Sequence, residues 1–324
     1  MDWGALMNHL VAGQPLRSMT TLKAGGPAEW FAVAPTKGIL AELSRAAHQG
    51  KIPLTILGWG SNLLPADAGV RGLVVWNRAR KMVISRTGEV EFDTGCGFQD
   101  VFLRCAQAGL RGLEYAVGIP GTLGGALVSN AGAYRSQVSE FITELEVIEE
   151  GELKWVPPSH LQFSYRDSIL RRPVPPPLVV LSVRMQLPAG DPHAIYAEAR
   201  DYQRQRISKQ PPPASAGSFF KNVNDPDLAH RLPSLPPALR EAGVVPSGYL
   251  IQEAGLQGYR HEGAMLSRRH ANFIVNTGSA SATAIRQLAD IAKTTVRGQF
   301  GVELEEEVLM IGDWTGYQPA TFMP

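Results

Sequence analysis

Leu57-Gly58-Trp59-Gly60-Ser61-Asn62-Leu63 is the stretch that decides how the first part of this chain folds. It follows a short apolar run at 54–57, which indicates a β-strand that ends in a glycine turn. Successive backbone N–H groups in such a turn can form a concavity for anions. The stretch is not a G-x-G-x-x-G fingerprint, because Leu63 stands where the third glycine belongs, and no Gly-Lys-Ser/Thr of a P-loop follows. It is either a phosphate-binding loop or an ordinary tight turn.

A second glycine-rich stretch occurs further along the chain, at Gly118-Ile119-Pro120-Gly121-Thr122-Leu123-Gly124-Gly125. A helix that opens near Thr122 can present free N–H groups to a phosphate. Small and polar residues continue through Ser129-Asn130-Ala131-Gly132. The alternative is that two backbone segments simply pack tightly here. Two phosphate-compatible loops in one domain favour a large dinucleotide such as FAD.

The segments between these loops predict an α+β architecture. Short apolar stretches at 30–34, 54–57, 73–76 and 90–93 are bounded by turns and read as strands, and 143–149 and 178–187 add two more. Apolar spacing predicts helices at 38–49 and 98–108, each followed by a glycine. A further helix is expected to start in the region 188–192 and to run through Arg206.

The proline-rich patch Pro211-Pro212-Pro213 reads as a linker or stiff loop, and we place the last domain after it. In that domain we expect strands at 217–221, 273–276 and 304–311, and helices near 248–254 and at 282–300. Residues 312–324 have little periodicity and are expected to form a surface tail. The predicted division is 1–80 and 81–210 for two subdomains and 211–324 for the C-terminal domain.

Composition excludes several classes of protein. The 324 residues carry a formal net charge of only +1, and no basic stripe indicates a nucleic-acid partner. Cys96 and Cys105 are the only cysteines, too few for a structural zinc site, so no metal is predicted. The N-terminus shows no signal-peptide pattern and no segment is apolar enough to span a bilayer, so we expect a cytoplasmic protein without membrane partners.

Nine blocks in order, over about residues 18 to 312, closely resemble the UDP-N-acetylenolpyruvoylglucosamine reductase family. Each block is weak alone, but their order along the chain is specific. They are Thr20–Ala28, Leu57–Leu64, Gly112–Thr122, Asn130–Tyr134, Phe163–Ser168, Ala216–Asn222, Ala254–Tyr259, His270–Asn276 and Leu304–Val308.

The resemblance implies an FAD-binding fold of the vanillyl-alcohol-oxidase (PCMH) type in two subdomains, followed by a C-terminal α+β substrate-binding domain. It also implies non-covalent FAD and NADPH as cofactors, and a nucleotide-sugar substrate whose enolpyruvyl ether is reduced in peptidoglycan precursor synthesis. The chain looks like the shorter branch of the family, because residues 168–211 leave no room for the extra substrate-capping insertion. The residues that the resemblance assigns to the cofactor are Leu57, Gly58, Trp59, Gly60, Ser61, Asn62, Leu63, Gly118, Ile119, Pro120, Gly121, Thr122, Gly125, Ser129, Asn130, Ala131 and Gly132.

By family position, the catalytic residues are Arg166, Ser218 and Glu307. A guanidinium can grip the enolpyruvyl carboxylate, and a protonated Glu307 can stabilise the charge that hydride addition creates. Ser218 is the expected proton donor to the α-carbon. Read without the family, Arg166 is a surface ion pair with Asp167, Glu307 lies on a solvated strand edge, and Ser218 is a turn serine.

Three further residues, Tyr165, Lys221 and Asn222, are expected to bind the substrate; otherwise Tyr165 is core and the other two end a strand. Trp59, His261 and Glu262 depart from the family pattern, and His261 is expected at the pocket rim. Two other functions stay open: another FAD oxidoreductase of the same fold, or a non-catalytic nucleotide-sugar binding relative. No catalytic residue is lost, which argues against the second.

Overall fold

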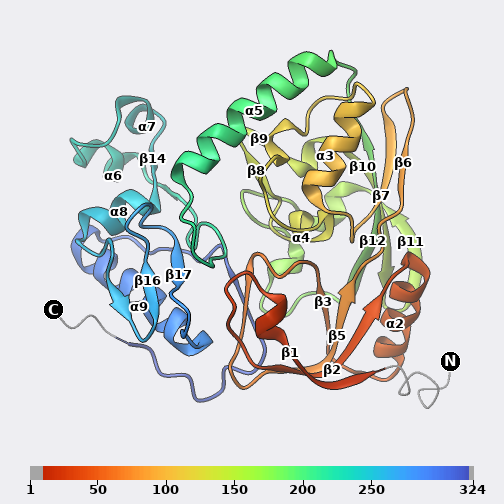
Figure 1. The fold of residues 1–324 in the computed structure, drawn as a ribbon, viewed down its shortest axis with the longest axis horizontal. Helices are drawn as coiled ribbons and strands as arrows, with labels where there is room; N and C mark the ends of the chain where they lie inside the picture. The colour runs from red at the N-terminus through yellow and green to blue at the C-terminus, as the bar shows by residue number, and fades with distance from the viewer. Residues whose placement is uncertain (1–9, 321–324) are drawn as a thin grey trace. The chain divides into compact units, whose positions relative to one another are not determined.

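The computed structural model describes residues 10–320, which form two compact units (Figure 1). Unit 1 contains residues 10–14, 28–60 and 71–208, and unit 2 contains 15–27, 61–70 and 209–320. Residues 15–27 and 61–70, which the sequence analysis places in the first subdomain, therefore belong to the unit that holds the C-terminal part of the chain. The three-domain division stays a prediction. Residues 1–9 and the end of the tail lie outside the described residues.

The first sheet has the strand order β1-β2-β5-β3, with β3 and β5 parallel. Its strands are β1 (Val11–Pro15), β2 (Pro27–Ala34), β5 (Val70–Asn77) and β3 (Leu54–Leu57). Helix α2 (Lys37–Gln49) begins where the Thr36 side chain accepts a hydrogen bond from the N–H of Ile39, and it buries Leu40 and Leu43. These elements confirm the strands and the helix predicted over 30–76.

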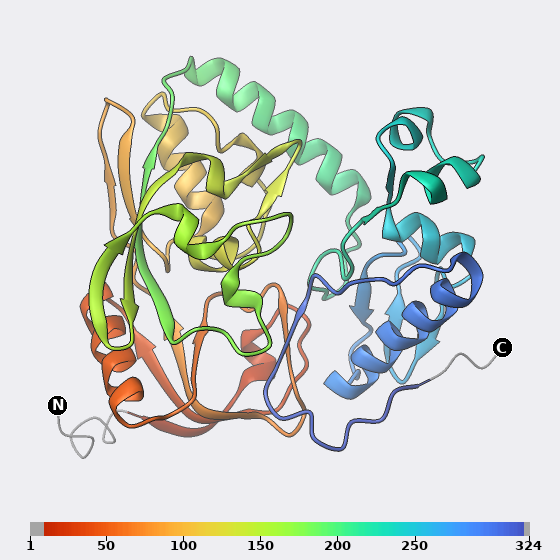
Figure 2. The ribbon, with the colours of Figure 1, turned by 180° about the vertical axis from the view of Figure 1, so that it is seen from behind.

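The second sheet of unit 1 is antiparallel, with the order β11-β10-β12-β7-β6. Its strands are β11 (Glu152–Val156), β10 (Ile142–Glu149), β12 (Leu178–Gln186), β7 (Glu89–Asp93) and β6 (Met82–Ile84). Helices α3 (Phe98–Gln107), α4 (Leu123–Val128) and α5 (Pro192–Lys209) complete the core of this half, and Figure 2 shows α3 and α5 on one side of the sheet. The predicted helices at 98–108 and up to Arg206 are confirmed.

Several short pieces connect these elements. β8 (Gly132–Ala133) and β9 (Ser136–Gln137) form a hairpin. Single 3₁₀ turns lie at Leu16–Met19, Glu114–Ala116, Val138–Phe141, Pro158–Leu161 and Ile169–Arg171. Cys96 and Cys105 are both buried free thiols, and burial raises the pKa of each to about 12. No helix among residues 10–320 is long and apolar enough to cross a membrane.

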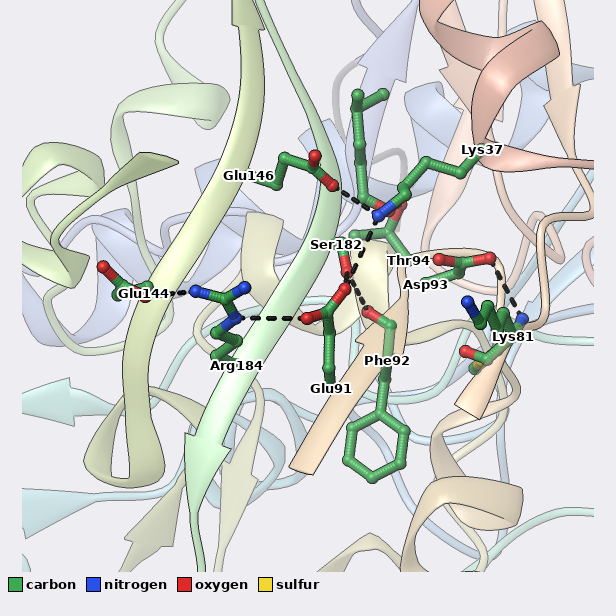
Figure 3. Close-up of polar contacts among 12 residues, drawn as sticks. Lys37, Lys81, Glu91, Phe92, Asp93, Thr94, Glu144, Glu146, Ser182 and Arg184 are labelled. Atoms are coloured by element: carbon green, nitrogen blue, oxygen red, sulfur yellow. Dashed lines mark hydrogen bonds and ion pairs between the residues drawn. The ribbon is translucent and has the colours of Figure 1, made fainter. Parts of the chain in front are cut away.

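A network of ion pairs ties the first residue of α2 to the second sheet (Figure 3). Lys37 Nζ lies 2.6 Å from Glu146 Oε2 and 3.5 Å from Glu91 Oε1. Arg184 Nε lies 3.1 Å from Glu91 Oε2, and its Nη1 lies 2.7 Å from Glu144 Oε2. Glu91 therefore bridges two cations, one from the helix and one from the central strand β12.

Unit 2 is built around one long helix, α9 (Ala282–Phe300), whose buried face includes Ile285, Leu288 and Ile291. Leu22 and Leu64, from the N-terminal segments of the unit, belong to the same core. Its other helices are α6 (Pro226–Arg231), α7 (Pro237–Glu241) and α8 (Ser247–Glu253). Its strands are β4 (Leu63–Pro65), β13 (Val223–Asn224), β14 (Val244–Val245), β15 (Arg260–His261), β16 (Ala264–Leu266), β17 (Ile274–Asn276) and β18 (Leu309–Ile311).

Strand β18 runs parallel to β4, and β15, β16 and β17 form an antiparallel sheet. The predicted helices near 248–254 and at 282–300 and the strand at 273–276 are confirmed. Two predicted strands are wrong. Residues 217–221 form no strand and contribute only an isolated bridge between Phe220 and Glu306, and the last strand covers 309–311 rather than 304–311. The backbone of 219–221 forms hydrogen bonds with the Asn272 side chain and with the irregular segment 305–307, so it joins no regular strand ladder.

The described part of the expected surface tail, residues 312–320, packs against α9. The guanidinium of Arg286 lies 4.5 Å from the ring centre of Trp314 and 3.9 Å from that of Tyr317. The Tyr317 hydroxyl donates a hydrogen bond to Asp290, and Gln287 Nε2 donates to Gln318 O over 3.0 Å. None of these residues is buried, so they lie at the surface as predicted, but two aromatic rings bind a cation on the helix and dock the segment there.

Candidate active site

Three glycine-rich turns that are far apart in the sequence meet in unit 1. A Cβ on Gly58 would lie 2.5 Å from Thr122 Oγ1, so the two loops that carry these residues touch. Gly97 forms an isolated bridge with Thr122, and a Cβ on Gly97 would lie 2.9 Å from the ring of Trp59. Glycine is needed at both positions because another segment of the chain occupies the space of a side chain. The tryptophan that departs from the family pattern thus covers a glycine.

The loop 118–122 is fixed by hydrogen bonds to the turn that precedes α3. Phe98 N donates to Gly121 O over 2.9 Å, and Leu123 N donates to Cys96 O over 2.8 Å. Gly124 N donates to Thr94 O over 2.8 Å, and Gly125 N donates to Thr122 Oγ1 over 3.2 Å. The first amides of α4 are therefore bound within the protein, and the expectation that they are free to hold a phosphate is wrong. The carbonyl oxygens of Thr94 and Cys96 accept hydrogen bonds from two of these amides.

Other donors of the first loop remain open. Within residues 10–320, the backbone N–H groups of Gly58 and Trp59 have no hydrogen-bond partner in the protein. They lie directly after β3, at the point where the loop contacts Thr122. Backbone amides in such a place suit a negatively charged group such as a diphosphate.

Asn130 is fully buried, and its side chain is committed to protein partners. Its Nδ2 donates to Gln137 Oε1 over 3.1 Å and to Ser164 O over 3.0 Å, and its Oδ1 accepts from Ser139 N over 3.3 Å. Asn130 thus joins the segment after α4 to the segment that carries Tyr165 and Arg166. Its side chain shapes the site by holding two segments together rather than by presenting its own amide.

Arg166 follows this junction and adopts a positive φ of 54°. Its guanidinium donates to Gly132 O and lies 5.2 Å from the ring centre of Tyr165. The Asp167 carboxylate next to it lies 3.7 Å from Arg171 Nε. Tyr165 is 48% exposed, which rules out a core role for this residue. The local fold therefore turns a cation and an aromatic ring away from the core.

Arg206 lies beside these residues and is absent from the sequence-based prediction. Its Nη2 donates to Tyr115 O over 3.2 Å, and a Cβ on Gly118 would lie 3.2 Å from its Cδ. Burial lowers the pKa of Arg206, and the charge of nearby Arg166 lowers it further. Two guanidinium groups therefore lie close enough to repel each other, one beside Gly118 and one bonded to Gly132 O, which favours an anionic ligand. No motif marks Arg206, because it is one arginine among several on the helix α5.

Ser218 and Glu307 are brought together in unit 2 by backbone hydrogen bonds. Glu307 N donates to Phe219 O over 2.7 Å, so the residue after Ser218 is bonded directly to Glu307. Asn62 Nδ2 donates to Glu307 O over 3.1 Å. The segment around 305–307 is irregular, although the sequence predicts a strand over 304–311.

Lys221 has a side chain that is only 8% exposed and pairs with the carboxylate of Glu305. Its backbone N–H also donates to Glu305 O over 2.8 Å. Asn222 is exposed. Lys221 is thus no solvated strand end, and its ammonium is held on the same segment that carries Glu307. Unit 2 holds Ser218, Lys221 and Glu307, whereas unit 1 holds Arg166 and Tyr165.

The two other departures from the family pattern lie at the β15–β16 turn. His261 Nε2 lies 2.9 Å from Gln287 Oε1 of α9, and Glu262 occupies the turn with a positive φ of 41°. The structure therefore gives His261 a contact with the long helix of unit 2. Its predicted place at a pocket rim stays a prediction.

Comparison with known proteins adds to this geometry. Residues 30–156 match an FAD binding domain, and residues 207–311 match the C-terminal domain of UDP-N-acetylenolpyruvoylglucosamine reductase. The reductase of that name from Synechococcus sp. (strain JA-3-3Ab) is 37% identical over 95% of this chain and 93% of its own length. The Bacillus subtilis (strain 168) reductase is 34% identical over 94% of this chain and 95% of its own. A crystal structure of the Thermus caldophilus enzyme has a TM-score of 0.72 and 31% identity, covering 93% of this chain and 98% of that one.

Proposed function

Because this chain belongs to the UDP-N-acetylenolpyruvoylglucosamine reductase family, it is a UDP-N-acetylmuramate dehydrogenase of peptidoglycan precursor synthesis, and we propose that Arg166, Ser218 and Glu307 carry its chemistry. It uses FAD and NADPH, and it binds a nucleotide-sugar substrate. The observation that supports these roles best is the direct bond from Glu307 N to Phe219 O. It keeps a hydroxyl and a carboxyl group on adjacent backbone segments.

The residues present fit FAD. Gly58 carries no side chain and packs against Thr122, so the two loops lie together, and the open amides of Gly58 and Trp59 are donors for the diphosphate. We propose that the loops 57–63 and 118–122 hold the cofactor, with 125 and 129–132 as supporting residues. Bound FAD supplies hydride transfer, from NADPH to the enolpyruvyl β-carbon. The protein must orient the substrate, stabilise its charge and deliver a proton.

Arg166 is proposed to bind the enolpyruvyl carboxylate. Hydride addition increases the negative charge on that group, and a fixed guanidinium stabilises it without reorganisation. The bond from Arg166 to Gly132 O and the positive φ hold the side chain in place before the substrate arrives. Tyr165 next to it is proposed to contact the same substrate. Lys221 and Asn222 are also proposed to bind polar groups of the substrate.

Ser218 is proposed to give its hydroxyl proton to the α-carbon, and the proton is then restored from solvent. A serine hydroxyl is a weak acid, so it must face a strongly basic carbon and be held still. Glu307 is proposed to stabilise the same intermediate in its protonated form. We also propose that the reaction takes place in the cytoplasm, where NADPH is regenerated.

The test separates the two half-reactions in anaerobic holoenzyme. In Ser218→Ala we expect NADPH to reduce the flavin at an unchanged rate, whereas reoxidation by UDP-N-acetylglucosamine enolpyruvate slows by roughly 100-fold or more. Ser279→Ala, an exposed serine of the same unit, is the matched control and should keep both rates. Loss of flavin reduction instead would refute the role of Ser218. Reoxidation of the wild-type protein by oxygen alone would point to another flavoenzyme of this fold.

A further inference from the structure

Both the oxygen and the nitrogen of the Asn272 side-chain amide form hydrogen bonds with the backbone of Phe220. It is 3% exposed, its Oδ1 accepts from Phe220 N over 2.9 Å, and its Nδ2 donates to Phe220 O over 2.9 Å. Its own carbonyl accepts from Phe219 N over 2.7 Å. One buried residue thus satisfies three backbone groups of the two residues that follow Ser218.

The segment that Asn272 holds is itself hydrogen-bonded to the segment that carries Glu307. Phe219 O accepts a hydrogen bond from Glu307 N, and Lys221 N donates one to Glu305 O, so the backbone groups that Asn272 does not bind are bonded to the segment 305–307. Residues 218–221 form no strand, so no ladder fixes them from the Asn272 side. The side-chain amide therefore takes the place of a neighbouring strand, and it does so two residues from the proposed proton donor.

We propose that Asn272 is a positioning residue that fixes Ser218 and Glu307 relative to each other. The inference rests on the proposed roles of those two residues. The amide touches neither substrate nor cofactor in this role; it acts only through the backbone of 219–220. Because proton delivery to carbon depends steeply on the position of the donor, a small shift of this backbone slows that step and leaves hydride uptake from NADPH intact.

The chain contains a matched control, Asn276, four residues further on. Asn276 is also buried, at 7% exposure, and its amide also spans backbone groups: Nδ2 donates to Leu22 O over 2.9 Å, and Oδ1 accepts from Gly278 N over 2.8 Å. Its partners lie outside both 218–221 and 305–307. Loss of its amide costs stability of unit 2 without disturbing the catalytic segments.

The experiment compares Asn272→Asp with Asn276→Asp as FAD-loaded holoenzymes. Each substitution keeps the shape of the side chain and removes its donor, leaving a buried carbonyl unsatisfied. We expect similar losses in thermal midpoint for the two. We expect Asn272→Asp alone to slow substrate-dependent flavin reoxidation by roughly 10- to 100-fold, with flavin reduction by NADPH unchanged.

A second pair, Asn272→Ser and Asn276→Ser, removes the bonds without burying a charge and covers the case in which an aspartate variant does not fold. Equal reoxidation rates in the Asn272 and Asn276 variants would overturn the positioning role, and so would a parallel loss of both half-reactions in the Asn272 variant. Ser218→Ala, measured alongside, keeps the two proposals apart. If it slows reoxidation while the Asn272 variants do not, only the inference about Asn272 fails.

Discussion

Gly58 has no space for a side chain, because Thr122 Oγ1 would lie 2.5 Å from its Cβ. We expect Gly58→Ala to lower stability by about 1–3 kcal/mol through overpacking, and to reduce the FAD retained on purification. The measurements are the thermal midpoint and the ratio of flavin to protein absorbance. Adding Thr122→Ala should recover part of the loss, since it removes the atom that clashes.

Gly298 is the control for this substitution. It lies exposed in α9 with no atom within 4 Å of its Cβ position, so Gly298→Ala should raise stability by up to about 1 kcal/mol. A Gly58→Ala protein with wild-type midpoint and flavin content would show that the two loops separate easily and that their contact does not hold the cofactor.

At the scale of single residues, the family blocks single out Ser218 and Glu307, and the structure places them on adjacent segments. Their catalytic roles remain a proposal. The partners that hold them, Asn62 and Asn272, come from residues far away in the chain, and no local pattern reports such a hydrogen bond. The amides of α4 were misjudged for the same reason: the carbonyls that bind them belong to another turn.

At the scale of elements, Glu91 fastens α2 to the second sheet (Figure 3). Burial acts to raise its pKa, but the hydrogen bond from Arg184 and the charge of Lys37 outweigh burial, and the pKa falls below its ordinary 4.5. A carboxyl whose pKa is lowered on folding stabilises the protein above pH 4.5 and loses that contribution as the pH falls through the folded-state value.

We therefore expect Glu91→Gln to cost about 0.5–1 kcal/mol at pH 7, the size of a partly exposed ion pair. Denaturant titrations at pH 7 and at about pH 3 check this, and the two proteins should converge in acid, where the carboxyl is protonated. Glu42→Gln, an exposed position on α2, is the control and should show no difference at either pH. A gap that persisted in acid would assign the loss to packing rather than to charge.

Asp67 binds the start of α9 from a distant segment. Its carboxylate accepts from Ala282 N over 2.9 Å, from Thr283 N over 2.8 Å and from Thr283 Oγ1 over 2.8 Å. We expect Asp67→Ala to lower the stability of unit 2 by about 0.5–2 kcal/mol, as for a lost helix cap. Asp67→Asn keeps one acceptor oxygen and should lose less. Equal stability of the alanine variant and the wild type in denaturant titrations would contradict the capping role.

The elements that sequence patterns predicted correctly are those whose own periodicity is strong. Helix α9 and strand β12 bury a continuous apolar face, so spacing alone identifies them. Residues 217–221 and 304–308 look like strands because they are apolar or alternate, yet their bonds go to Asn272 and to each other. Sequence periodicity does not predict that residues 312–320 dock on α9, because the docking depends on Trp314 and Tyr317 binding the cation of Arg286.

At the scale of the whole molecule, the chain order and the compact units do not coincide. Unit 2 takes residues 15–27 and 61–70 from the N-terminal region. These segments supply Leu22 and Leu64 to its core, the parallel partner of β18, and the cap of α9. The linker prediction at 211–213 thus marks the end of one segment of the chain but not an independent folding unit.

We therefore expect the fragment 209–324 not to fold cooperatively when it is expressed alone. The fragment lacks Leu22 and Leu64, which fill part of this core in the intact chain. Loss of one such side chain from a core lowers the free energy of unfolding by about 2–5 kcal/mol, which is comparable to the stability of a small domain. Thermal circular dichroism and amide exchange of the fragment check this against the intact chain carrying Leu64→Ala, which should still unfold cooperatively at a lower midpoint. A fragment that unfolds in a sharp transition, with a midpoint near that of the intact chain, would show that the core of unit 2 folds without residues 15–27 and 61–70. A broad transition would show that the core of unit 2 forms only together with residues 15–27 and 61–70. The second of these segments carries Asn62, whose side chain binds Glu307 O, so the support of Glu307 would depend on the same assembly.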